Sequence, residues 1–216
     1  MSCQTCETVT DIDGNVYKTI KIGDQIWMAE NLRVTHYING DAIKKINYSR
    51  RMIPNGDGEY CAYDNFEINA DTFGYLYNWY AVTDSRKIAP EGWHVPTDEE
   101  IKQLEMTVGM SESEANDSLW RGTNEGEKLA GFVDLWDDGW HIRDSTLVSS
   151  GFDFLPGGCI DKKGFTSLGY VGCLWSSTEF YIRDTAMIRL FNFSRKQIYR
   201  DYHAKGRFCS VRCVRD

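Results

Sequence analysis

Residues 92–109 read GWHVPTDEEIKQLEMTVG and carry the clearest local signal in the chain. Thr97 and Glu100 have the spacing of a capping box, in which each side chain binds the backbone N–H of the other residue. The apolar residues that follow recur at helical spacing: Ile101, Leu104 and Val108. Gly109 comes next, and glycine is typical of a helix end. We predict a helix that begins near Thr97 and buries one apolar face.

The N-terminal segment, residues 11–32, reads DIDGNVYKTIKIGDQIWMAENL and is typical of β-structure. Asp13-Gly14 and Gly23-Asp24 are turn sequences, and apolar and polar residues alternate between them. The pattern Asp-x-Asp-Gly-Asn also resembles part of a calcium loop. An EF-hand loop needs a third carboxylate before its glycine and a later bidentate Glu, and both are missing here. The sequence therefore favours a hairpin turn.

A second helix is predicted upstream of the first, and strands are predicted downstream. Residues 71–82, DTFGYLYNWYAV, place a cap at Asp71 or Thr72 before apolar residues at helical spacing. From Gly151 onward glycines and aromatic residues show no helical period. Residues 185–193 and 196–202 read as two strands around a turn, and residues 208–216 read as a closing strand. These elements predict an α+β fold.

Length and composition favour one folded domain. The chain has 216 residues, of which 42% are hydrophobic and 13% aromatic, so it can bury a core. No linker rich in Pro, Ser or Gly divides it, and we expect a tail at residues 1–8 and a single domain at 9–216. No run of about 18 apolar residues is long enough to cross a bilayer. The N-terminus is polar and does not resemble a secretory signal, so we expect a trimmed mature form or no export by that route.

The charge is distributed unevenly along the chain. Residues 183–216 hold nine Lys or Arg and three Asp, whereas the first 182 residues hold 15 basic and 29 acidic residues. The net charge of −8 repels nucleic-acid phosphates, and the basic stretch contains no recognised nucleic-acid motif. We therefore expect no nucleic-acid partner. The concentration of basic and aromatic residues near the C-terminus instead indicates a special surface there or a solvated charged face.

The seven cysteines and four histidines give no complete metal or catalytic pattern. Cys3-x-x-Cys6 has no second pair spaced to match, and a loose tail is the default interpretation. Cys159 and Cys173 flank a glycine-rich stretch and could close a short disulfide loop. His94 precedes the predicted helix alone, and such a histidine is usually structural. We expect no cofactor, no metal site and no catalytic residue.

Several stretches, in order along the chain, resemble a known family. They are DIDGNVYKTIKIGDQIWMAENL, YCAYDN, FGYLYNWYAV, APEGWHVPTDEE, GFDFLPGG, LWSSTE and SVRCVRD. Together they are similar to the Fibrobacter succinogenes major paralogous domain. This resemblance implies a C-type lectin-like fold, in which two helices flank small twisted antiparallel sheets and a loop-rich C-terminal half presents a ligand surface. It also implies a relation to the variable proteins of diversity-generating retroelements.

By that resemblance, residues 179–207 correspond to the segment that varies in the retroelement proteins. Within it we select residue types that binding surfaces favour. These candidate ligand-binding residues are Tyr181, Arg183, Asp184, Asn192, Tyr202 and His203. We expect Phe191 and Phe193 to be core, and Arg189 and Arg200 to belong to the scaffold.

Two functions from different classes follow from the resemblance. The first is a non-enzymatic domain that binds an unknown protein or glycan and is displayed on a cell surface, as a lipoprotein if a signal was trimmed, or on a phage virion. The second is a thiol oxidase like the related formylglycine-generating enzymes, with Cys209 and Cys213 as its pair. The spacing of these two cysteines does not match the relatives' catalytic pair, so we expect the binding function.

Overall fold

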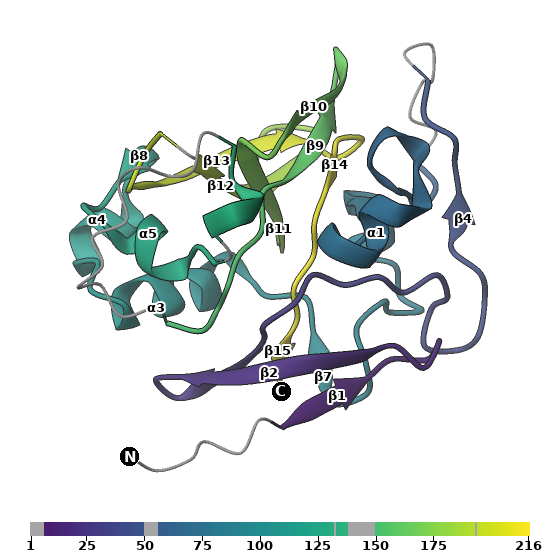
Figure 1. Ribbon diagram of the computed structural model, residues 1–216, viewed down its shortest axis with the longest axis horizontal. Coiled ribbons are helices and arrows are strands. Elements are labelled where there is room, and N and C mark those ends of the chain that lie inside the picture. Colours follow the sequence, from purple (N-terminus) through teal and green to yellow (C-terminus); the bar gives the residue numbers. More distant parts are fainter. Residues whose placement is uncertain (1–6, 50–55, 132, 138–149, 193) are drawn as a thin grey trace.

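The computed structural model describes residues 7–49, 56–131, 133–137, 150–192 and 194–216, and the pair Cys3 and Cys6, like Phe193, lies outside them. Within these residues the chain has a mixed α+β fold with two β-sheets (Figure 1). The smaller sheet has the strand order β1 (Thr8–Thr10), β2 (Val16–Ile22), β3 (Gln25–Met28), β15 (Val214–Arg215) and β7 (Trp93–His94). The C-terminal strand β15 therefore lies beside the hairpin formed by β2 and β3.

The larger sheet carries most of the surface discussed below. Its order is β4 (Lys44–Lys45), β5 (Glu59–Cys61), β6 (Leu76–Asn78), β14 (Phe208–Cys209), β9 (Gly157–Asp161), β11 (Val171–Glu179), β12 (Thr185–Asn192), β13 (Ile198–Ala204) and β8 (Leu119–Arg121), with β10 (Gly164–Leu168) paired to β9. The two predicted strands around Ser194 and Arg195 are confirmed as β12 and β13. Their hairpin closes where the Arg195 N–H donates to the Asn192 carbonyl at 3.0 Å.

The described helices are α1 (Glu67–Phe73), α2 (Trp79–Val82), α3 (Asp98–Thr107), α4 (Glu112–Asn116) and α5 (Glu125–Leu129), with 3₁₀ turns at Tyr63–Asn65 and Val133–Leu135. The prediction for α3 is confirmed: Thr97 is its N-cap, and Thr97 and Glu100 form the full capping box. Helices α3, α4 and α5 gather on one side of the larger sheet, next to β8 and β12 (Figure 1).

The helix predicted to begin near Thr72 is wrong. Thr72 lies near the end of α1, and Gly74 then adopts a φ of +74°. This left-handed φ ends the helix, and a Cβ at Gly74 would lie 2.8 Å from Cβ of Asn31 and from the Leu32 carbonyl oxygen, so glycine is required there. The next residues form β6, an interior strand of the sheet. Leu76 and Tyr77 point to opposite faces of the sheet, and both are buried because β6 is an interior strand. Apolar residues on both faces remove the alternation that marks a strand, so the sequence pattern resembled that of a helix.

The C-terminal residues do not form the single predicted strand. Phe208–Cys209 pairs with β6 and β9 in the larger sheet, whereas Val214–Arg215 pairs with β3 and β7 in the smaller one. The chain between them therefore crosses from one sheet to the other. Val211, Cys213 and Val214 on this path are all buried.

One disulfide joins the strands of the larger sheet, and it is not the one considered from the sequence. Cys173 on β11 is bonded to Cys209 on β14, with their Cα atoms 5.2 Å apart. The two strands meet because the Ser210 N–H donates to the Cys173 carbonyl at 3.0 Å. Cys159 is a free, buried thiol. The disulfide between Cys159 and Cys173 considered above is therefore absent.

The largest buried cluster joins the two sheets. Tyr17 and Met28 come from the smaller sheet, and Tyr77, Trp175 and Ile188 come from the larger one. A second cluster packs α3 against Phe191, which is 2% exposed and confirmed as a core residue. The shared core holds the larger sheet as a firm base for the loops at its ends.

Candidate functional site

Five of the six candidate binding residues meet at one end of β12 and β13. Tyr181, Arg183 and Asp184 lie exposed on the connection between β11 and β12. Antiparallel pairing places Met187 opposite Tyr202 and Ala186 opposite His203. Both candidate residues of β13 therefore lie next to this connection, and both are half-buried.

Asn192 does not lie with the other five candidates. It lies at the other end of β12, six residues beyond Ala186, which corresponds to roughly 20 Å along a strand. Its side-chain oxygen accepts hydrogen bonds from the backbone N–H of Ser194 at 2.9 Å and from the Ser194 hydroxyl at 2.7 Å. Asn192 therefore holds the β12–β13 turn.

The exposed face of this end carries three aromatic rings in contact. Phe180 lies between Tyr181 and Tyr202, with ring centroids 4.2 Å from each. Tyr181 is 88% exposed, which is unusual for so large a ring. We call Phe180, Tyr181 and Tyr202 the aromatic cluster. Its rings offer rigid contact area that loses little conformational entropy on binding.

The opposite face of β13 borders a surface groove of about 660 Å³. Tyr202 and His203 are neighbours in a strand, so their side chains point to opposite faces of the sheet. His203 and Asp184 line the groove. Its other lining residues come from distant segments: Ile46, Tyr48, Glu59, Asn78, Ile160, Asp161, Lys162, Lys163, Ala204, Gly206, Arg207 and Phe208.

Arg207 connects His203 to the free thiol beneath the groove. Its Nη1 donates to a ring nitrogen of His203 at 2.9 Å, and its Nη2 donates to Sγ of Cys159 at 2.8 Å. Burial and then the charge of Arg207 lower the pKa of His203 to about 4. Burial raises the pKa of the Cys159 thiol. At neutral pH, Arg207 therefore contacts two uncharged groups.

His203 gives a test of this arrangement by pH. Its folded pKa of about 4 lies below the ordinary value of 6.5, so the unfolded chain takes up a proton first as the pH falls. His203 therefore favours unfolding progressively as the pH drops from about 6.5 towards 4. We expect an NMR titration to give a midpoint near 4, and Arg207→Met to raise it. A midpoint at the ordinary value in the unaltered protein would contradict the observed contacts.

His94 serves as a comparison in the same NMR titration, because its pKa is shifted in the opposite direction from that of His203. Burial alone would lower the pKa of His94, but hydrogen bonds from its ring to Asp216 and Glu100 outweigh burial and raise it. The ring nitrogens lie 2.6 Å from Asp216 Oδ1 and 2.7 Å from Glu100 Oε1. His94 ties the end of the chain to α3, which agrees with the structural role predicted for it.

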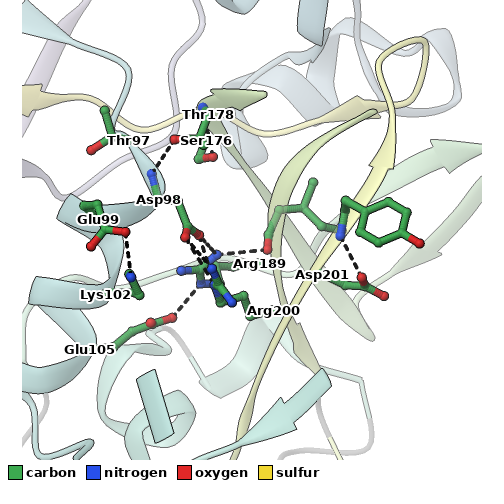
Figure 2. A network of polar contacts seen from close by, with 12 residues as sticks. Thr97, Asp98, Glu99, Lys102, Glu105, Ser176, Thr178, Arg189, Arg200 and Asp201 are labelled. Atoms are coloured by element: carbon green, nitrogen blue, oxygen red, sulfur yellow. Dashed lines mark hydrogen bonds and ion pairs between the residues drawn. The ribbon is translucent and has the colours of Figure 1, made fainter. Parts of the chain in front are cut away.

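A buried ion network fixes β12 and β13 against α3 (Figure 2). Arg189 is fully buried and binds Asp98 and Glu105, each at 2.7 Å. Arg200 of β13 binds the same Asp98 at 2.6 Å, and Arg121 of β8 binds Glu105 at 2.6 Å. The scaffold role predicted for Arg189 and Arg200 is confirmed. This network sets the position of the strands that carry the candidate site.

Sequence reasoning missed the groove residues outside residues 179–207, among them Tyr48, Lys162 and Lys163. The two lysines form the tip of the β9–β10 hairpin, because Asp161 pairs with Gly164 across them. Two polar residues before a glycine are a turn signal that could have located this tip. No local pattern places it opposite Arg207, which lies 44 residues later in the chain.

The cysteine pair considered for thiol oxidation does not form. Cys209 is bonded to Cys173, and Cys213 is a separate, fully buried thiol whose pKa is raised by burial. Among the residues described above, no group of three or more His, Cys, Asp or Glu side chains is arranged to hold a metal ion.

The chain is a mixed α+β protein, and five candidate binding residues lie at one end of its larger sheet. The chain belongs to the Fibrobacter succinogenes major domain family, whose model matches residues 20–215. The resemblance stated from the sequence is thus confirmed. No curated protein and no solved structure matches the chain. In the described part of the chain, none of the helices has the length and apolar character to cross a bilayer.

Proposed function

We propose that this protein is a non-enzymatic ligand-binding domain with a C-type lectin-like fold. Its ligand-binding surface is the end of β12 and β13, where Tyr181 and Tyr202 lie in the aromatic cluster, Arg183 lies on the exposed connection, and Asp184 and His203 lie beside the groove. The observation that supports it most is the 88% exposure of Tyr181, at the edge of the aromatic cluster. Aromatic and arginine side chains dominate binding energy at protein surfaces.

The setting that we propose is a cell surface or a phage virion, with a protein or glycan as ligand. The exposed connection between β11 and β12 starts and ends in strands that the disulfide and the ion network hold in place. Side chains there can change without disturbing the core, which a variable binding protein of the retroelement type requires. The strand β15 beside the first hairpin agrees with the chain path that a C-type lectin-like fold implies.

Substitutions at Tyr181 and Arg183 test the binding face. We expect Tyr181→Ala and Arg183→Ala to change the free energy of unfolding by no more than about 0.5 kcal/mol, because both side chains are exposed. Each should weaken ligand binding by about 2 kcal/mol or more if it is a central contact. The measurements are a thermal melt of each variant and its binding to a glycan array and to a displayed library of surface proteins.

The control is Ile12→Ala. Ile12 is 51% exposed in the turn between β1 and β2, on the smaller sheet. In Figure 1 this sheet lies at the bottom of the molecule, well away from β12 and β13. Ile12→Ala should retain every ligand that the unaltered protein binds. Equal retention by Tyr181→Ala and Arg183→Ala would reject the proposed face.

A further inference from the structure

The acidic residues of the groove already have donors. Glu59 Oε1 accepts from Lys44 Nζ at 2.7 Å. Asp184 Oδ1 accepts from the Tyr80 hydroxyl at 2.8 Å, and Asp161 Oδ1 accepts from the backbone N–H of Lys163 at 2.7 Å. These carboxylates therefore serve partly to order the groove walls.

The basic residues of the groove differ from the acidic ones in their partners. Over the described ranges, no carboxylate forms an ion pair with Lys162, Lys163 or Arg207. Both lysines are exposed at the hairpin tip, whereas Arg207 is half-buried in the wall. The groove thus has three cations that are free to pair with an incoming anion.

Of the three cations, Arg207 has the strongest physical need for an anionic partner. Its guanidinium has five N–H donors, and its acceptors are a neutral imidazole and a thiol, which is a weak acceptor. Nothing in the described part of the chain accepts a hydrogen bond from its buried Nε. A half-buried cation without an anion is poorly stabilised, and a carboxylate can bind a guanidinium through two parallel hydrogen bonds.

Several of the other lining residues are apolar. Ile46, Ile160 and Phe208 are buried at the groove, and the Tyr48 ring packs against Phe208 with centroids 6.2 Å apart. Ligand sites commonly combine such an apolar lining with a few convergent polar groups. An occupant that matches both parts has an apolar body and one anionic group.

We infer that the groove binds a ligand whose carboxylate pairs with Arg207 while its apolar body lies against Tyr48 and Phe208, with Lys162 and Lys163 attracting it at the rim. This inference rests on the proposed binding function and specifies the chemistry of one part of it. The occupant that we propose is the C-terminus of a peptide that ends in an apolar residue, because it supplies both the carboxylate and the apolar body. A uronic acid of a glycan carries the carboxylate without the apolar body, so it serves as the comparison in the test.

The test uses two matched pairs of small probes and the intact chain with its disulfide. One pair is N-acetyl-L-phenylalanine and its neutral amide, and the other is D-glucuronic acid and D-glucose. Backbone amide shifts in NMR titrations locate each probe and give its affinity. We expect N-acetyl-L-phenylalanine to shift the amides of Lys163 and Arg207, and its neutral amide to bind about tenfold more weakly, as the loss of a charge-assisted pair predicts. D-glucuronic acid should bind more weakly than N-acetyl-L-phenylalanine, because it lacks the apolar body.

Two variants assign the effect to the named cations. Arg207→Met should weaken binding of the acid about tenfold, whereas Arg195→Met on the exposed β12–β13 turn should not. If Arg207→Met fails to fold, a double variant of the exposed lysines, Lys162→Ala with Lys163→Ala, tests the inference instead. Lys21→Ala on β2 is its control. This double variant should weaken acid binding and reduce its dependence on salt.

Three results would overturn the inference: equal binding of acid and neutral probe, no shift of groove amides with either acid, or unchanged acid binding in the cation variants. None of them bears on Tyr181, whose test uses another face and needs no carboxylate. If the carboxylate test fails but Tyr181→Ala loses its ligand, only the inference about the groove is rejected, and the proposed binding function is retained. Failure of both would reject the function as well.

Discussion

Glu105→Ala will lower the free energy of unfolding by about 3–5 kcal/mol, because it removes one partner from a buried set of charges. Glu105 is fully buried, and its two oxygens bind Arg189 and Arg121 at 2.7 and 2.6 Å. Without it, both guanidinium groups stay buried, and Arg121 has no other ion pair in the described part of the chain. Urea unfolding with the disulfide intact measures the loss.

The matched control lies on the same helix. Glu99 also forms an ion pair, with Lys102 at 2.6 Å, but its side chain is 80% exposed. Water screens such a pair, so Glu99→Ala should cost no more than about 1 kcal/mol. If Glu105→Ala cost as little as Glu99→Ala, the network would not be what holds α3 against β12 and β13. The candidate site would then need another explanation for its position.

Trp175→Ala will destabilise the protein by about 3–5 kcal/mol, the usual cost of truncating a buried large aromatic side chain. Trp175 is fully buried in the cluster that joins the two sheets. Its Nε1 also donates to the Tyr77 carbonyl at 2.9 Å, so the substitution leaves a cavity and an unpaired buried acceptor. Thermal and urea unfolding should agree on the size of the loss.

Trp120→Ala is the comparison for Trp175→Ala. Trp120 is only half-buried on the edge strand β8, where its ring contacts Tyr199 and Arg195. The same deletion of an indole should therefore cost much less there, because water fills the space that it leaves. Similar losses at the two positions would mean that Trp175 is not at the centre of the core. Phe191→Ala, in the second cluster, should resemble Trp175→Ala.

Local signals in the sequence were sufficient where short-range contacts alone set the structure. The Thr97 capping box fixes the start of α3 because both of its hydrogen bonds lie within four residues. The Asp13-Gly14 turn is similarly local: Asp11 Oδ1 accepts from the N–H groups of Asp13 and Asn15 at 3.0 and 2.9 Å. The two strands predicted around a turn likewise form the hairpin of β12 and β13.

Periodicity failed where the sheet buries a strand on both faces. Residues 71–82 show apolar residues at helical spacing, yet the middle of this stretch is β6. Its neighbours β5 and β14 come from distant parts of the chain, and only their pairing makes both faces of β6 buried. A similar limit applies to Cys209, whose disulfide partner depends on where β14 meets β11.

The sequence by itself determined the family, the mixed α+β class and the helix after Thr97. Five of its six candidate binding residues lie at one end of β12 and β13, and their role in binding stays a prediction. Only the tertiary structure decided that Asn192 lies apart, that the closing strand is split between two sheets, and that Lys162 and Arg207 share a groove. The physical reason is that pairing between distant strands depends on packing of the whole core. Capping and alternation depend on neighbours in the chain, and a single sequence records only those neighbours directly.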